Sequence, residues 1–385
     1  MNTAVARRTR ALRELTTVLR GDPGAPVPDD APGWAAFLEL ASVHGLLPAV
    51  WAALRASGRV TIPDAVLDAL ERAAPSGRVV PEVVLRRAYA ENTVRVHRLL
   101  GTGVEILQWC AAESIRAVPL KGLHSLLAGT WSDPAVRTMA DLDILVDPPE
   151  ASRAFAMLRA RGFGEHPDPI GEHADHHLPM LQRGDVTVEL HTELLVSRWQ
   201  TLAPAADVLR RARHCPTPQG EFLLADETDT LVHLVAHAQL QEETYTLLGL
   251  PLRALFETAR LDPRPIDWNA ARARFARASV DHVFDAHVVA AHELFAANLP
   301  IEPSVGRATS RARVHLQLAE AGVAVPDALG TWTYVVRLPR SFAHERMVDE
   351  FGTPAGAAWL WRSRARHAAR RVAARLGRDG NPPTH

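Results

Sequence analysis

Two aspartates in one short segment offer the clearest chemistry in this sequence. Residues 140–146 (ADLDILV) alternate polar and apolar side chains, which predicts a strand. Alternate residues of a strand project from the same face, so the carboxylates of Asp141 and Asp143 should lie side by side, with the intervening apolar residues toward the core. Adjacent carboxylates repel each other unless a cation lies between them, and hard oxygen ligands suit Mg²⁺ or Mn²⁺.

A third carboxylate lies on a second predicted strand. Residues 176–191 (HHLPMLQRGDVTVELH) predict a hairpin whose turn is at 183–185. Its second strand places Glu189 and His191 on one face and the apolar residues on the other. A site with three carboxylates can hold metal ions that stabilise the attacking and leaving oxygens of a phosphoryl or nucleotidyl transfer. We expect His191 to have a supporting role.

A lone lysine precedes these strands. The chain has 43 Lys and Arg residues, and Lys121 is its single lysine. Arginine is a planar fork whereas lysine is a compact point charge, so this position is a candidate for chemistry that arginine does poorly. Lys121 and Gly122 stand where a predicted strand, 115–120, meets a predicted helix, 121–129. Free backbone N–H groups at such a junction bind phosphate well.

Two further residues could contact the phosphates. Ser125 lies three residues beyond Gly122 in the predicted helix. Arg137, four residues before Asp141, could supply a second clamp on the phosphates. A structural ion pair of Arg137 with Asp133 or Asp141 would explain this arginine equally well.

These segments together resemble a known family. The run LKGLHSLLAGTWSDPAVRTMADLDILV (120–146), then GF (162–163) and VELH (188–191), is similar to the uncharacterised nucleotidyltransferase family of the polymerase-beta-like superfamily. The superfamily usually has Gly-Gly or Gly-Ser where this chain has Lys121 and Gly122.

The resemblance implies a small mixed sheet with flanking helices and transfer of NMP from an NTP, with release of pyrophosphate. By the same resemblance Asp141 and Asp143 would be metal ligands. Glu189 would be the third carboxylate and would orient or deprotonate an acceptor hydroxyl. We expect ATP as the nucleotide; the acceptor stays open between a small molecule, a protein side chain and an RNA end.

The elements around these residues predict an α+β fold. The order helix, strand, helix, strand, helix, hairpin places a small mixed-sheet core between helical lobes. The predicted divisions are a helical lobe at 1–90, the catalytic core at 91–200, a second helical lobe at 201–300 and an extension at 301–385 with an arginine-rich tail. The apolar spacing predicts helices at 34–54, after Pro63, at 91–114, at 148–164 and at 225–241.

The composition excludes several classes of protein. Hydrophobic residues make up 47% and charged residues 23% of the chain, which are ordinary values for a globular protein. The net charge is -1, so the chain as a whole has no excess positive charge that would favour binding to nucleic acid. No run of 18 apolar residues predicts a membrane span, and the N-terminus has no secretory pattern. Two well-separated cysteines argue against a disulfide framework and favour a cytoplasmic location.

Alternative functions remain open at this point. The histidines 173, 176, 177 and 191 could suggest zinc, although their spacing is not that of a tight ligand set. His233 and His237 share a helical face, which favours packing or a place in the wall of the cleft. The arginine-rich residues 361–378 could contact nucleic acid, and the fold could also serve as a non-catalytic, antitoxin-like binding module.

Overall fold

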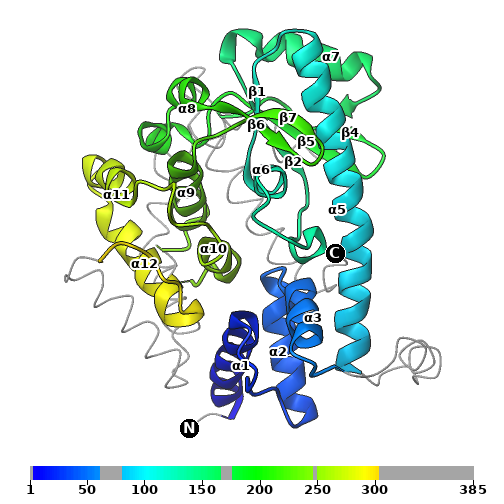
Figure 1. Ribbon diagram of the computed structural model, residues 1–385, viewed down its shortest axis with the longest axis vertical. Coiled ribbons are helices and arrows are strands. Elements are labelled where there is room, and N and C mark those ends of the chain that lie inside the picture. The colour runs from blue at the N-terminus through cyan, green and yellow to red at the C-terminus, as the bar shows by residue number, and fades with distance from the viewer. Residues whose placement is uncertain (1–2, 61–79, 166–175, 246–248, 303–385) are drawn as a thin grey trace, which may run out of the picture.

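The computed structural model describes residues 3–60, 80–165, 176–245 and 249–302, and shows an α+β fold (Figure 1). A mixed sheet of five strands lies among helices from both halves of the chain. The helix predicted after Pro63, His173 and the arginine-rich segment 361–378 lie outside the described residues.

The α-helices of the described residues are α1 (Thr3–Arg20), α2 (Ala31–Val43), α3 (Leu47–Ala56), α5 (Pro81–Ala112), α6 (Lys121–Leu127), α7 (Ala151–Ala160), α8 (Ala205–Arg211), α9 (Glu227–Ala236), α10 (Leu252–Thr258), α11 (Trp268–Arg277) and α12 (Asp281–Phe295). Short 3₁₀ segments are η1 (Pro134–Val136), η2 (Pro148–Glu150) and η4 (Ser197–Leu202), and η5 (His237–Gln241) is a π-helix. The strands are β1 (Ala117–Pro119), β2 (Leu142–Val146), β3 (Gly164–Glu165), β4 (Leu181–Arg183), β5 (Val186–His191), β6 (Arg213–Thr217) and β7 (Gly220–Leu224).

The main sheet brings together strands that are distant in sequence. Its order is β1-β2-β5-β4-β3, in which β2 and β5 run parallel and the other neighbours run antiparallel. The β4–β5 hairpin turns at Gly184, whose φ of 64° lies in the left-handed region that glycine adopts without strain. The predicted hairpin at 176–191 is therefore confirmed, with a shorter first strand.

The two faces of the sheet pack into different clusters. The intervening apolar residues of β2, Leu142, Ile144 and Val146, are buried in a cluster with side chains of α5 and α7, as their alternation predicted. On the opposite face Leu145 packs with Val118 and with side chains of α8, α9, α11 and α12. Asp143 shares this second face, so the carboxylate is covered by helices from the C-terminal part of the chain.

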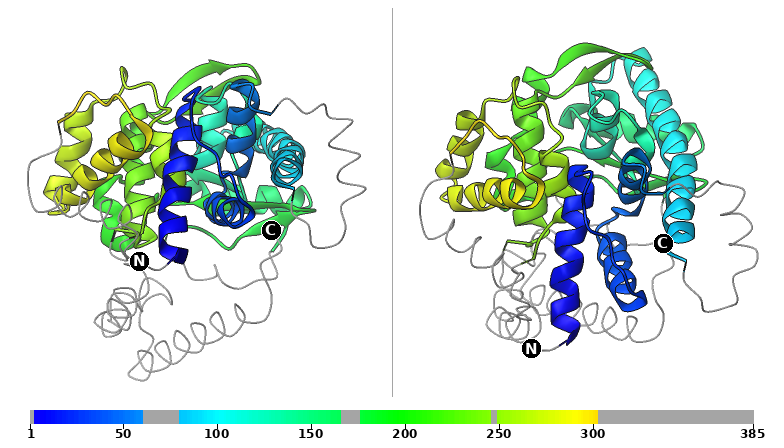
Figure 2. Two further views of the ribbon diagram at one scale, coloured as in Figure 1. Left: turned by 90° about the horizontal axis from the view of Figure 1, so that it is seen from below. Right: turned by 60° about the horizontal axis from the view of Figure 1, so that its bottom comes forward.

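Helix α1 connects the N-terminal helices with the C-terminal ones. It packs against both α2 and α12, below the sheet in the view of Figure 1. Arg20 Nε donates to the carbonyl of Leu294 at 2.9 Å, and Arg260 donates to the carbonyl of Leu19 at 2.9 Å. Figure 2 shows α1 crossing the base of the molecule between the two groups of helices.

The N-terminal half departs from the predicted helices in two places. Residues 34–54 form two helices because the chain turns at Gly45, whose φ is 63°, and α2 begins earlier, at Ala31, where Asp30 caps it. The long helix α5 begins at Pro81, ten residues before the predicted start and across the predicted division at 90, because proline suits a first helical turn.

Among the described residues no single helix has the length and apolar composition of a membrane span. Helices α2 and α3 have that length and composition only when taken together, and they are bent by 119° relative to each other.

The C-terminal half contains two features that the sequence did not predict. Strands β6 and β7 form a separate hairpin within the segment expected to be all helix. The predicted helix at 225–241 is α-helical only to Ala236 and continues as the π-helix η5. Such wide turns occur often at functional sites, and this one contributes His237 and Ala238 to the pocket described below.

Candidate functional site

The parallel pairing of β2 and β5 builds the acidic site. In this register Asp143 is the direct neighbour of Glu189, and Leu145 is the neighbour of His191. Because parallel neighbours in register project to the same face, the two carboxylates meet above the second cluster. Strand alternation then adds His191, two residues beyond Glu189.

The polar atoms of this site lie within contact distance of one another. Lys121 Nζ is 2.7 Å from Asp143 Oδ1, and His191 Nε2 is 2.9 Å from the same oxygen. His191 Nε2 also lies 3.4 Å from Glu189 Oε2. One ligand atom each from Asp143, Glu189 and His191 fall within 4.8 Å of one another. Two carboxylates and an imidazole form a donor set that fits a divalent cation.

Burial and charge set the protonation of this site. Burial favours the neutral form of Asp143, but the Lys121 ammonium and the hydrogen bond from His191 outweigh it and hold the pKa well below its usual value. For Glu189, burial is likewise outweighed by the hydrogen bond from His191, and the pKa is lowered. The same contacts raise the pKa of His191 against its burial. Both carboxylates are therefore ionised at neutral pH, and the Lys121 ammonium lies next to Asp143.

Asp141 lies directly before β2 and differs from Asp143. Burial, and then the charge of Asp143, raise the pKa of Asp141 to about 6. The Asp141 carboxylate does not belong to the group of Asp143, Glu189 and His191, whose ligand atoms lie within 4.8 Å of one another. The structure thus brings two of the three predicted metal ligands together with His191, and places Asp141 beside that group.

Lys121 begins α6 in an unusual backbone conformation. Its φ is 45°, in the left-handed region that costs energy for a residue with a Cβ. Such strained positions often occur at functional sites. Gly122 follows, and a Cβ there would lie 2.6 Å from Met139 Cγ, so the close packing of Met139 on α6 requires a glycine.

Ser125 is held by internal hydrogen bonds. Its hydroxyl donates to the carbonyl of Gly122 at 2.9 Å and accepts from Trp131 Nε1 at 3.2 Å. Ser125 is buried and lines the pocket described below. These contacts fix the serine against its own helix, which gives it a clear packing role beside the predicted contact with phosphate.

Arg137 pairs with an acid that the sequence did not single out. Its guanidinium Nε lies 2.9 Å from Glu257 Oε1 in α10, and both side chains are buried. The alternative pairing with Asp133 or Asp141 is therefore wrong, because among the described residues the ion pair of Arg137 is with Glu257. Asp133 accepts from Tyr89 Oη at 2.8 Å and from the backbone of η1. No local pattern pointed to Glu257, since 120 residues separate it from its partner.

A pocket of about 230 Å³ adjoins the acidic site and shares Lys121 with it. Its wall comes from the α2–α3 turn, α6, the segment before β2, α9, η5 and α10. The residues that bear polar chemistry are His44, Lys121, His124, Ser125, Thr130, Trp131, Arg137, Asp229, Thr230, His233, His237, Glu242, Arg253 and Glu257. Of these, the sequence predicted only Lys121, Ser125 and Arg137 as binding residues.

The histidines divide into two groups. His176, His177 and His191 lie together with ring centroids 4.8 to 5.6 Å apart, but His176 and His177 are not part of the cluster of ligand atoms. His233 and His237 lie in the pocket wall, in line with their predicted place. Burial lowers the pKa of His233 to about 3, so this imidazole is neutral at physiological pH.

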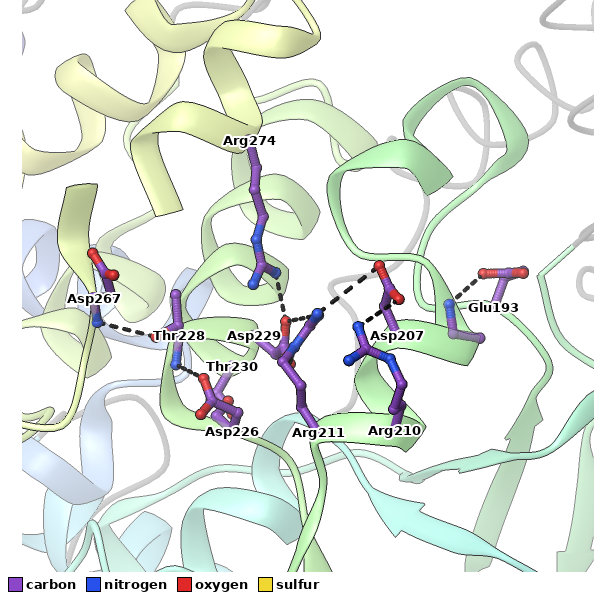
Figure 3. A network of polar contacts seen from close by, with 11 residues as sticks. Glu193, Asp207, Arg210, Arg211, Asp226, Thr228, Asp229, Thr230, Asp267 and Arg274 are labelled. Carbon is purple, nitrogen blue, oxygen red and sulfur yellow. Dashed lines mark hydrogen bonds and ion pairs between the residues drawn. The ribbon is translucent and has the colours of Figure 1, made fainter. Parts of the chain in front are cut away.

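A buried ion cluster in the pocket wall holds α9 in place. Figure 3 shows Asp229 between two arginines from different helices. Arg211 donates two hydrogen bonds to the Asp229 carboxylate, at 2.7 and 2.8 Å, and Arg274 donates a third. One residue along, Thr230 Oγ1 lies 3.2 Å from His124 Nε2 in α6. This cluster connects α8, α9 and α11 to the helix that carries Lys121.

Comparison with known proteins identifies the family. The family model for an uncharacterised nucleotidyltransferase matches residues 30–296. The chain belongs to this family. The match runs from the start of α2 to the end of α12, so the nucleotidyltransferase unit includes helices on both sides of the sheet as well as the core. No curated protein matches the chain.

Proposed function

We propose that this chain is a metal-dependent nucleotidyltransferase that moves NMP from an NTP, with ATP as the preferred nucleotide, to an acceptor hydroxyl and releases pyrophosphate. The observation that carries the proposal is the in-register meeting of Asp143 and Glu189 on parallel strands, with Lys121 Nζ 2.7 Å from Asp143. Membership of the nucleotidyltransferase family supports the same reaction class.

The residues fit a divalent cation. We propose that Asp141, Asp143 and Glu189 hold Mg²⁺ or Mn²⁺, and that His191 orients Asp143 through their 2.9 Å contact. Such an ion supplies positive charge to phosphate oxygens during the transfer. Lys121 adds a second positive charge next to Asp143, where the triphosphate would lie, and Gly122 and Arg137 complete the phosphate contacts.

Glu189 is suited to orient an acceptor hydroxyl. Its lowered pKa keeps it ionised at neutral pH, and its side chain is only half-buried, so a hydroxyl can approach it. We propose that Glu189 orients the acceptor hydroxyl and accepts its proton as the oxygen attacks the α-phosphorus. The chemistry then depends on positioning and charge rather than on a covalent nucleophile.

The decisive experiment is an NTP panel. The protein is incubated with each NTP, with Mg²⁺ or Mn²⁺ and with pools of small-molecule, protein and RNA acceptors. Pyrophosphate release and nucleotide adducts are measured by mass spectrometry. Asp143→Asn should abolish both signals, whereas Asp185→Asn, an exposed aspartate in the β4–β5 turn, should leave both unchanged. Equal behaviour of wild type and Asp143→Asn with every nucleotide and acceptor would reject catalysis and favour a binding module.

A second experiment separates the two sets of metal ligands. Mn²⁺ binding is measured by calorimetry for Asp141→Asn and for His191→Ala. We expect the larger loss of affinity in Asp141→Asn, because His191 acts through Asp143. The reverse order would assign His191 to the metal, as the cluster of ligand atoms within 4.8 Å would also allow.

The proposal also includes a cytoplasmic location and the absence of nucleic-acid and membrane partners.

A further inference from the structure

The pocket beside Lys121 lies on the nucleotide side of the proposed site. Lys121, Ser125 and Arg137, three of the predicted phosphate contacts, all line it. Glu189, the residue proposed to orient the acceptor hydroxyl, is not one of the residues in its wall. A group that occupies this pocket is therefore next to the phosphates rather than next to the attacking hydroxyl.

The size and charge of the pocket suit an uncharged ring system. Its volume of about 230 Å³ is below the roughly 300–1,000 Å³ of pockets that enclose drug-sized ligands. Each charged residue of its wall has an opposite charge nearby. The opposite charges are Asp143 for Lys121, Glu257 for Arg137, Arg211 and Arg274 for Asp229, and Arg253 for Glu242. A further charge inside the pocket would be buried without a partner, which is costly.

His124 of α6 contributes a ring nitrogen that lacks a partner. Burial lowers the pKa of His124 to about 4, so its imidazole is neutral at pH 7. Its Nε2 lies 3.2 Å from Thr230 Oγ1, and the Thr230 hydroxyl donates to the carbonyl of Asp226 at 3.2 Å. Because a hydroxyl has a single proton, Thr230 accepts from His124 Nε2, which leaves Nδ1 as a bare acceptor. Nδ1 is buried and has no hydrogen-bond partner among the described residues.

His233 of α9 contributes a second such nitrogen to the same pocket. It lies three residues after Thr230, on the same face of the helix. In the part of the chain that the structure describes, no group forms a hydrogen bond with its buried Nε2. The exposed fractions of His124 and His233 are only 5% and 4%, so water does not readily replace the missing partners. Buried polar atoms are normally hydrogen-bonded, and two exceptions in one pocket indicate a ligand that supplies the bonds.

We propose that the pocket holds the adenine ring of ATP and that His124 Nδ1 accepts a hydrogen bond from its exocyclic amino group. The inference rests on the proposed function and deepens it, because it names the residue that selects the base. An amino group supplies the proton that Nδ1 lacks. A carbonyl in that position, as in guanine, would place two acceptors against each other and would leave both unsatisfied.

The test compares ATP with purine riboside triphosphate, which lacks only the exocyclic amino group. Binding of each nucleotide is measured by calorimetry with Mg²⁺ and without an acceptor. His124→Phe removes both ring nitrogens, and His124→Asn keeps an amide oxygen that can accept in place of Nδ1. His97→Phe is the matched control, because His97 is an exposed histidine of α5 outside the pocket.

We expect the wild type and His97→Phe to bind purine riboside triphosphate about tenfold more weakly than ATP, because one buried hydrogen bond is lost. His124→Phe should bind the two nucleotides equally, and His124→Asn should regain part of the preference for ATP. Equal binding of the two nucleotides by the wild type would overturn the inference, whether or not any variant folds. A preference for ATP that His124→Phe retains would also overturn it.

This test separates the role of His124 from the proposed reaction, because binding is measured without turnover. A preference for ATP that depends on His124, in a protein that releases no pyrophosphate, would refute only the nucleotidyltransferase proposal. Pyrophosphate release together with equal binding of the two nucleotides by the wild type would refute only the role of His124.

Discussion

Lowering the pH from 7 to 5 should destabilise the protein through several buried histidines, and His287 of α12 is the one whose contribution can be isolated. Its imidazole is fully buried between two other helical segments. Thr258 donates its hydroxyl proton to the carbonyl of Ala254 at 2.9 Å, so it accepts from His287 Nε2, also at 2.9 Å. Gln239 Nε2 donates to the other ring nitrogen at 3.0 Å. This network requires the neutral imidazole with its proton on Nε2.

The size of the effect follows from the two pKa values. Burial lowers the pKa of His287 to about 3, whereas an unfolded histidine has a pKa near 6.5. Between these values the unfolded chain binds a proton that the folded protein does not, so the free energy of unfolding falls as the pH falls through 6.5. From pH 7 to pH 5 this one group accounts for about 2 kcal/mol of lost stability. The figure does not depend on the folded pKa as long as that pKa stays below about 4.

The assay is urea unfolding at both pH values for wild type, His287→Gln and His282→Gln. His282 is an exposed histidine of the same helix and serves as the matched control. His287→Gln should be less stable than wild type at pH 7, but should lose about 2 kcal/mol less on acidification. His282→Gln should follow the wild type. If His287→Gln loses as much stability as the wild type, His287 accepts a proton in the folded state and the reasoning fails.

Three further predictions concern packing, buried charge and catalysis. Gly101→Ala in α5 should stabilise the protein by about 0.5–1 kcal/mol, because the new Cβ meets nothing within 4 Å. Gly103→Ala should destabilise the protein by about 1–3 kcal/mol, because the new Cβ would lie 2.7 Å from the Leu123 side chain in α6. Thermal unfolding of both variants checks that the two changes in stability have opposite signs. Asp229→Asn should lower the free energy of unfolding in urea by about 3–5 kcal/mol, because it leaves two arginines in a buried cluster without their carboxylate. Asp207→Asn, at a more exposed aspartate, should lower it by less than about 1 kcal/mol. Equal losses of stability would mean that burial of the cluster is unimportant. Lys121→Arg should reduce pyrophosphate release about tenfold or more with an unchanged circular dichroism spectrum, because a planar guanidinium cannot replace an ammonium 2.7 Å from Asp143; full activity would make the single lysine an accident of composition.

The local sequence patterns predicted which face of β2 and of β5 carries the acidic residues. Alternation in 140–146 and 186–191 correctly separated the buried apolar residues from Asp143 and Glu189, because side-chain direction in a strand has a fixed period of two. The lone lysine also lies at the strand-to-helix junction that the sequence indicated. Whether Asp141, Asp143 and Glu189 are catalytic stays a prediction.

The errors occurred where a local pattern was ambiguous. Apolar spacing in 34–54 is helical on both sides of Gly45, and only the backbone turn there separates α2 from α3. Residues 213–224 lack strict alternation, so the β6–β7 hairpin gave no strand signal. The α5 helix extended beyond its predicted start because its first turns are stabilised by packing on α3 as well as by their own periodicity.

The sequence by itself therefore determined the residue types, their faces and the family resemblance. Only the tertiary structure decided which of these residues meet: Asp143 with Glu189 across parallel strands, Lys121 with Asp143, and Arg137 with Glu257. The physical reason is that periodicity depends on neighbours a few residues away, whereas strand pairing and buried ion pairs depend on how distant elements pack. For the same reason the pocket beside Lys121 became visible only in the folded chain.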